Sequence, residues 1–327
     1  MSTDPAPLVT GITAVLIGVT DFRPHLDLLC GELGFEVAAE GVVRAADAAR
    51  LWGAEAGRRD VEAMMLTAAG ASTGRIHLLK VDDPVAPAAH PHTLDLGLAA
   101  VDIYTKDLAA THARLTAAGY PCGTPSTFEV PVGDITVSVT EGFCFGPDGT
   151  DLVFVQPASA RATAAWDADP ERHYTEVSSV VCHAPDFEAE LGFWAALGMT
   201  AGYDVTFGSP GFEVMADLPQ GTRARMAFVT GAGGGTARVE LLQVPDNPGG
   251  VDRRAVQRPG RGLGHTGWSA VTRDLDAAVA AAESAGGRVQ CRPFATATPL
   301  HGDARLAVVD TPNGVSVELW QPRHSFH

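Results

Sequence analysis

Apolar and polar positions follow one long pattern that occurs four times along the chain. In each repeat an alternating apolar run ends in a short polar turn that contains an aspartate followed by an apolar residue. A stretch with helical spacing comes next, closes on a glycine, and leads into three further alternating runs. Alternation with period two predicts strands, and a spacing of three to four predicts a helix. Each repeat therefore predicts a βαβββ module.

The predicted elements lie at corresponding places in the four modules. We expect helices at 22–33, 108–118, 187–197 and 275–285. We expect first strands at 11–18, 97–104, 175–182 and 264–271, and last strands at 74–80, 151–156, 236–243 and 315–321. A repeat of this length determines the architecture of a chain. Proline-containing linkers divide the chain into an N-terminal pair of modules, residues 1–160, and a C-terminal pair, residues 161–327.

Composition narrows the class of protein. The chain has 327 residues, 46% of them hydrophobic, which is enough for two globular domains. Its net charge of −16 argues against binding to nucleic acid or to an anionic membrane, because both require clustered Lys and Arg. No apolar run is long enough for a membrane helix, and the N-terminus lacks the features of a signal peptide, so we expect a cytoplasmic protein. The five cysteines form no Cys-x-x-Cys pair.

Three strings resemble a known superfamily. They are FWAALGM at 193–199, the segment 262–278 and the segment 310–319. They resemble the vicinal oxygen chelate superfamily, also called the glyoxalase, bleomycin-resistance and extradiol-dioxygenase superfamily. The resemblance covers almost the whole chain and implies an α+β fold in which four βαβββ modules pair into two cup-shaped mixed-sheet domains. Because the superfamily hosts many chemistries, the fold alone does not specify the activity.

The resemblance also implies where a metal would bind. In such proteins the ligands come from the first and last strands of each module and point into the cup. The last strands place Glu240 in module three, Glu318 in module four and His77 in module one at this position. Module two has Val153 there, which cannot bind a metal.

The first strands are poorer in ligands. The register of the family, seven residues before the turn aspartate, falls on Ala14, Ala100, Ser179 and Gly267. His265 lies nine residues before Asp274 and shares a strand face with Gly267. A bulge would bring His265 to the ligand position. The predicted metal ligands are therefore His265, Glu240 and Glu318, with Glu318 and His265 also as catalytic acid/base groups.

Several alternatives stay open at this point. His265 is alternatively a hydrogen-bonded core histidine, and His77 is the one candidate of the N-terminal half. His301, in a loop beside Gly302, either covers the cup or is exposed. Extradiol dioxygenases need two His and one Glu, whereas Ser179 stands where the first His of the C-terminal half would lie.

The resemblance leads to a ranked set of functions. The first is a glyoxalase-like enzyme that acts on a small oxygenated metabolite by isomerase or lyase acid–base chemistry in the C-terminal cup. Its metal would be Zn, Mn, Fe, Co or Ni, or no metal at all, in which case the same residues would act directly. The alternatives are a metal-free small-molecule-binding protein of the bleomycin-resistance kind and an extradiol-type dioxygenase. The expected partners are a small-molecule ligand or substrate, with a homodimer as an open alternative.

Overall fold

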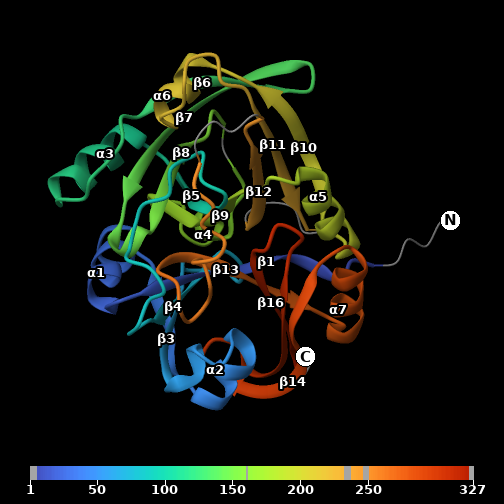
Figure 1. The fold of residues 1–327 in the computed structure, drawn as a ribbon. Helices are drawn as coiled ribbons and strands as arrows, with labels where there is room; N and C mark the ends of the chain where they lie inside the picture. Colours follow the sequence, from blue (N-terminus) through green and yellow to red (C-terminus); the bar gives the residue numbers. More distant parts are fainter. Residues whose placement is uncertain (1–5, 160, 232–236, 246–249, 324–327) are drawn as a thin grey trace.

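The computed structural model describes residues 6–159, 161–231, 237–245 and 250–323, and its elements follow the predicted modules (Figure 1). Module one comprises β1 (Val9–Val19), α1 (Phe22–Leu26), the π-helical turn η1 (Asp27–Glu32), β2 (Glu36–Val43), α2 (Ala45–Trp52), the 3-10 turn η2 (Ala56–Arg58), β3 (Val61–Thr67) and β4 (Arg75–Lys80). Module two comprises β5 (Gly97–Thr105), α3 (Leu108–Ala117), β6 (Ser126–Val132), β7 (Ile135–Phe145), the 3-10 turn η3 (Pro147–Gly149) and β8 (Asp151–Gln156), and α4 (Ala164–Ala168) follows it. Module three comprises β9 (Tyr174–His183), α5 (Phe187–Ala196), β10 (Thr200–Phe207), α6 (Pro210–Met215), β11 (Ala224–Thr230) and β12 (Arg238–Gln243). Module four comprises β13 (Gly264–Thr272), α7 (Leu275–Ser284), β14 (Arg288–Thr298), β15 (Gly302–Asp310) and β16 (Ser316–Pro322).

The repeated aspartate is the N-cap of the first helix in every module. The Asp21 side chain accepts a hydrogen bond from the backbone N–H of Arg23. Asp107, Asp186 and Asp274 each accept one from the backbone N–H three residues later. Because the first N–H groups of a helix have no partner within the helix, such a carboxylate stabilises its start. The cap explains why the same residue type recurs at each turn.

The modules pair differently from the expectation. The strand orders are β14-β15-β16-β13-β1-β4-β3-β2 in one eight-stranded sheet and β10-β11-β12-β9-β5-β8-β7-β6 in the other. Module one thus shares a sheet with module four, and module two with module three. The predicted division into one cup from 1–160 and another from 161–327 is therefore wrong. Alternation indicates which face a residue occupies, but it carries no information about the partner of an edge strand.

The fold class itself is confirmed, since two curled mixed sheets each form a cup. We call the cup of modules one and four cup A and that of modules two and three cup B. In each cup the first strands of the two modules meet antiparallel, β1 with β13 and β5 with β9. On β16, Val317 and Leu319 pack into one large core that joins both sheets. Glu318 lies on the opposite face, inside cup A.

Two short helices lie where the pattern of four modules predicts none. Each is inserted between the second and third strands of its module. In module one α2 packs against β14 and β15, and in module three α6 packs against β6 and β7. Both helices therefore lie against strands of the partner module and cover the cup. Burial of Ala48 and Leu51 on one face of α2 follows a helical spacing that the sequence does contain.

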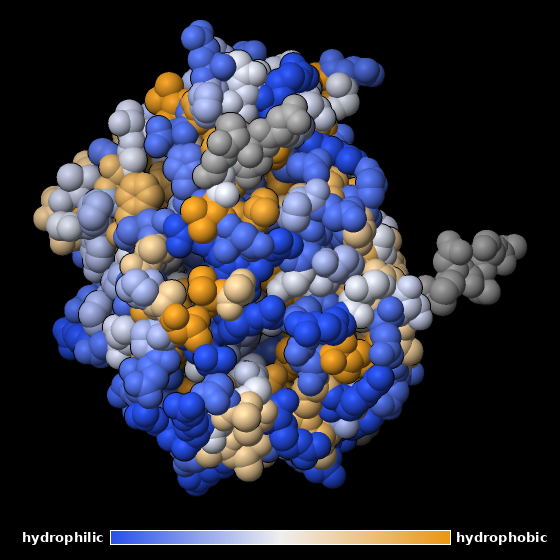
Figure 2. Space-filling view, in the orientation of Figure 1, coloured by the Kyte–Doolittle hydropathy of each residue, from blue (hydrophilic) through white to orange (hydrophobic). Residues whose placement is uncertain are grey.

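The face in Figure 2 is mostly hydrophilic, and its hydrophobic residues occur in small separate groups. None of the helices in the described ranges combines the length and the apolar character that a membrane span requires.

Candidate metal centre

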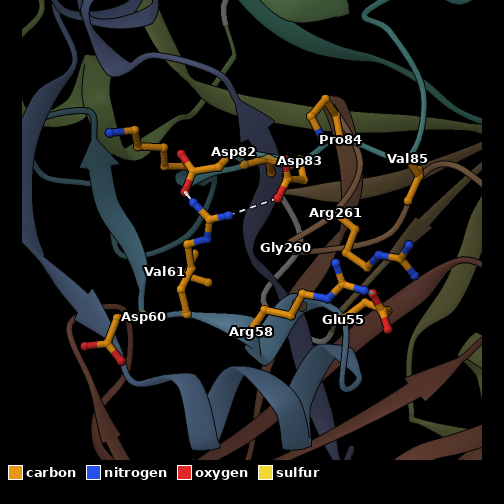
Figure 3. Close-up of a pocket in the computed structure, with 14 residues that line it drawn as sticks. Glu55, Arg58, Asp60, Val61, Asp82, Asp83, Pro84, Val85, Gly260 and Arg261 are labelled. Atoms are coloured by element: carbon orange, nitrogen blue, oxygen red, sulfur yellow. Dashed lines mark hydrogen bonds and ion pairs between the residues drawn. The ribbon is translucent and has the colours of Figure 1, made fainter.

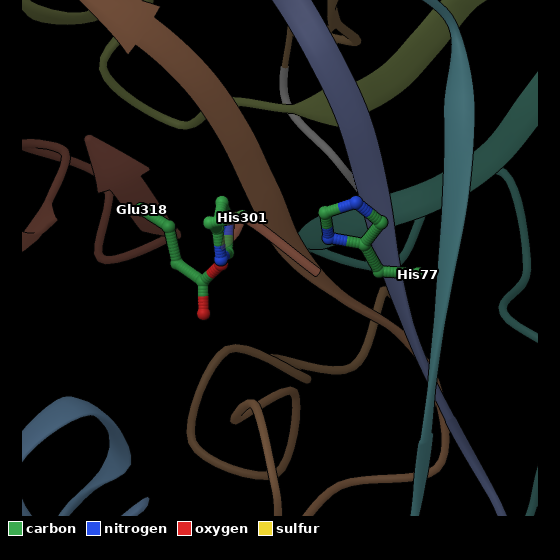
Figure 4. Close-up of side chains that lie close together, drawn as sticks. All are labelled: His77, His301 and Glu318. Atoms are coloured by element: carbon green, nitrogen blue, oxygen red, sulfur yellow. The ribbon is translucent and has the colours of Figure 1, made fainter. Parts of the chain in front are cut away.

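Three ligand-type side chains converge inside cup A. They are His77 on β4, His301 in the turn between β14 and β15, and Glu318 on β16, and they face one another in Figure 4. One ligand atom from each lies within 4.8 Å of the others. No other group of three such residues in the described part of the chain meets this criterion. The site therefore takes one ligand from module one and two from module four.

The register of the central strands leaves room for this convergence. Ala14 on β1 pairs with Ser269 on β13, and Ser269 pairs with Glu318 on β16. Ala14 and Ser269 are small, so they leave space for the longer side chains of the neighbouring strands. Ser269 Oγ lies 3.2 Å from His301 Nε2. His301, from the hairpin of β14 and β15, thus lies beside Ser269, a position on the first strand of module four that carries no metal ligand.

Hydrogen bonds orient two of the three ligands. Trp52 Nε1, from α2, donates to Glu318 Oε1 over 2.7 Å. His301 Nδ1 lies 3.1 Å from Thr298 Oγ1, which leaves Nε2 to face the cup. Glu318 Oε2 lies 3.4 Å from His301 Nε2 without forming a hydrogen bond, and the buried His77 Nδ1 also lacks a partner. Buried polar atoms are normally paired, so these two free acceptors mark a place where a cation would be bound.

Burial sets the protonation states of the site. It raises the pKa of Glu318 to about 7, an effect that the Trp52 hydrogen bond partly opposes. It lowers the pKa of His301 to about 3. The pKa of His77 lies well below its usual value because of burial and then because of the charges of His301 and Arg75. Both imidazoles are neutral at pH 7, which is the form that binds metals.

Family models match most of the chain. Residues 11–154 match one model and residues 178–302 match another, and both are described as the glyoxalase/bleomycin resistance protein/dioxygenase superfamily. This chain belongs to that superfamily. Its resemblance to the vicinal oxygen chelate superfamily is thereby confirmed. Searching curated proteins finds none that matches the chain.

Solved structures support the superfamily fold. Glyoxalase I from Zea mays has a TM-score of 0.63 at 16% identity, over 95% of this chain and 92% of that chain. A putative dioxygenase from Bacillus subtilis subsp. subtilis str. 168 has a TM-score of 0.62 at 12% identity, over 98% of this chain and 87% of that chain. Identities this low establish the fold and leave the activity to the residues of the site.

The predicted ligand set needs a correction. Of its three residues, the structure brings only Glu318 to the metal centre. Glu240 lies in cup B. His265 is 1% exposed, and its Nε2 lies 3.2 Å from the backbone N and 3.0 Å from the backbone O of Asp151. These contacts tie β13 to the start of β8 in the other sheet, so His265 matches its alternative as a hydrogen-bonded core histidine. The set His265, Glu240 and Glu318 is therefore wrong as a single site.

His77 and His301 complete the centre, although neither belongs to the predicted ligand set. His77 occupies the ligand position that the resemblance assigns to it, but it seemed isolated because its partner module was expected to be module two. His301 stands outside the family register altogether. Its one local signal is Thr298 three residues earlier, which binds both the backbone N and the ring Nδ1 of His301 and so closes the hairpin.

A groove on module one contrasts with this centre. Figure 3 shows charged residues along it, with Arg59 donating to Asp82 and Asp83 over 2.9 Å each. Arg58 pairs with Glu55. Because these charges neutralise one another at the surface, the groove has no convergent set of free ligand atoms comparable with that of cup A.

Trp52→Phe is expected to raise the pKa of Glu318 further and to destabilise the metal-free protein by about 1–2 kcal/mol at pH 8. The reason is the loss of the indole N–H that stabilises the carboxylate, which leaves a buried acceptor unpaired. Infrared titration of the carboxyl band and urea unfolding measure the two effects. Trp320→Phe is the matched control, since its indole N–H donates to Thr13 Oγ1 instead. An equal pKa shift in both variants would contradict the assignment.

Proposed function

We propose that the protein is a divalent-metal-dependent enzyme that acts on a small oxygenated metabolite in cup A. The observation that carries the proposal is the convergence of His77, His301 and Glu318. Two imidazoles and one carboxylate form the ligand set that non-haem iron(II) oxygenases use. The proposal therefore favours dioxygenase-type chemistry over the glyoxalase-like isomerase or lyase chemistry expected from the sequence.

The residues present fit a bound ion. His77 Nδ1, His301 Nε2 and Glu318 Oε2 are the atoms that would hold it. A bound divalent ion polarises the oxygens of a substrate that chelates it. The chain itself contributes orientation: Thr298 holds the ring of His301, and Trp52 holds one oxygen of Glu318 so that the other faces His301.

The enclosed position of the site restricts the substrate. The side chains of His301 and Glu318 are 2% and 0% exposed. Trp52 lies against Glu318, and Trp320 lies 5.4 Å from His301 between ring centroids. Trp52 and Trp320 therefore both lie close to the ligand side chains, where a bound substrate would contact them. Such an enclosed cup suits a small substrate and excludes water from the bound state.

Metal loading tests the proposal directly. The purified protein is stripped with a chelator and titrated anaerobically with Fe²⁺ and, separately, with Zn²⁺, Mn²⁺, Co²⁺ and Ni²⁺. We expect one ion per chain. We also expect the iron form to take up oxygen with catechol, a probe substrate that has hydroxyl groups on two adjacent carbons. Failure to bind any of the five ions would overturn the proposal. Turnover of a hemithioacetal or another hydroxycarbonyl without oxygen uptake would replace the oxygenase part by the isomerase alternative.

A second candidate uses the same cup without a metal. Glu318, with a pKa of about 7, and the neutral His301 at 3.4 Å could exchange a proton with a bound substrate. This candidate predicts full activity in the presence of a chelator. The homodimer also stays a prediction, and sedimentation of the purified chain tests it.

A further inference from the structure

Cup B contains a second cluster of charged side chains. Asp102 on β5, Glu141 on β7 and Glu240 on β12 line a narrow cavity of about 50 Å³. The side chains of Asp102 and Glu240 are hydrogen-bonded to each other. Most other lining residues are apolar, and they include Phe143 and, from the covering helix α6, Phe212 and Met215. The cavity therefore combines an acidic floor with apolar walls.

Corresponding positions in the two cups explain why cup B differs from the metal centre. Arg238 and Glu240 stand on β12 where Arg75 and His77 stand on β4, since each pair occupies the first and third residues of its strand. Val153 pairs with Asp102 in cup B as Glu318 pairs with Ser269 in cup A. Cup B has thus exchanged an imidazole and a carboxylate for a different arrangement of acids. Among the described residues, the ligand atoms of this cluster do not converge within 4.8 Å of one another as those of cup A do.

An independent observation points to a ligand in this cavity. His183, on β9, lines the same cavity and is 1% exposed. Its Nε2 is buried and has no hydrogen-bond partner. Burial lowers the pKa of His183 to about 4, so the ring is neutral and can accept a hydrogen bond. A buried, unpaired ring nitrogen on a residue that lines a cavity beside carboxyl groups favours a ligand that can donate hydrogen bonds.

We propose that cup B binds a primary ammonium group carried by an apolar chain or ring. An ammonium group offers three donors, which match the acids and His183 Nε2. A cavity of about 50 Å³ holds a group of this size, since a single water needs only about 10–15 Å³. Phe143, Phe212 and Met215 would contact the apolar part.

Electrostatics supports the same ligand class. Burial raises the pKa values of Asp102 and Glu240, and it raises that of Glu141 to about 8, so burial disfavours the charged forms of these carboxyl groups. Arg238 compensates part of the remaining charge, and it is held by Tyr104 and Ser179. A cation in the cavity would stabilise the ionised carboxylates, whereas the three carboxylates would repel an anion more strongly than Arg238 alone would attract it.

Calorimetric titration of the full chain with n-hexylammonium, 1-hexanol and hexanoate tests the proposal. We expect saturable binding of hexylammonium at least tenfold tighter than that of hexanol, and no binding of hexanoate. Glu240→Gln should lower the affinity for hexylammonium at least tenfold, and Asp102→Asn should do the same. Glu129→Gln, which removes a charge from the exposed face of β6, should leave the affinity unchanged.

Three results would overturn the proposal. They are equal affinity for hexanol and hexylammonium, an equal loss in the Glu129→Gln control, and no saturable binding of hexylammonium. Thermal unfolding of each variant verifies that it is folded. Because Glu240 and Asp102 lie outside cup A, none of these results depends on the metal site.

Discussion

Glu318→Gln should lower the affinity of the protein for a divalent ion by at least about 100-fold and abolish metal-dependent turnover. The substitution keeps the volume of the side chain and its contact with Trp52, but it removes the anionic oxygen that faces His301. Loss of an outer partner alone costs 10–100-fold in metal affinity, so loss of a charged ligand costs at least the upper value. Competition with a fluorescent chelator measures the affinity, and elemental analysis measures the metal content.

Glu240→Gln is the matched control for that prediction. It makes the same chemical change on the last strand of module three, but inside cup B, and it should leave metal binding unaltered. His301→Ala should behave as Glu318→Gln does, because it removes the second ligand of module four. If Glu240→Gln released the metal while Glu318→Gln retained it, the centre would have been placed in the wrong cup.

In the metal-free protein, Glu318→Gln should become more stable relative to the wild type as the pH rises. The difference in the free energy of unfolding between the two proteins should change by about 3 kcal/mol between pH 4.5 and a pH above 7. Burial raises the pKa of Glu318 from 4.5 to about 7 in the folded protein. The folded state therefore binds this proton more tightly than the unfolded state does, and stability is lost as the pH rises through this window. Each pKa unit corresponds to about 1.36 kcal/mol. Glutamine does not titrate and escapes this loss.

Urea unfolding at pH 4.5, 6 and 8 in the presence of a chelator measures this difference. The lowered pKa values of His77 and His301 have the opposite effect. They destabilise the folded protein as the pH falls below about 6.5. They are present in both proteins, so comparison of variant and wild type largely cancels their effect. A free-energy difference that stays constant over this range would show that Glu318 is not held in its protonated form. Adding the metal should reverse the order of stability at pH 8, because the ion requires the ionised carboxylate.

The local pattern of residues predicted the elements and faces well. The helices expected at 108–118 and 275–285 are observed at Leu108–Ala117 and Leu275–Ser284. Alternation on the last strand placed Val317 and Leu319 in the core, and it left Glu318 for the cup or for solvent. These predictions succeed because the period of a strand or helix is a property of neighbouring residues.

The sequence by itself thus determined the four modules, their capping aspartates, the superfamily and the strand face of Glu318 opposite Val317 and Leu319. Only the tertiary structure decided that module one pairs with module four, which brings His77 within reach of a carboxylate more than 200 residues away. It also decided that the hairpin turns His301 into the cup and that His265 contacts the backbone of Asp151 in the other sheet instead. The physical reason is that a strand edge offers the same backbone hydrogen bonds to any partner. Selection among partners depends on packing over the whole fold, which no local pattern records.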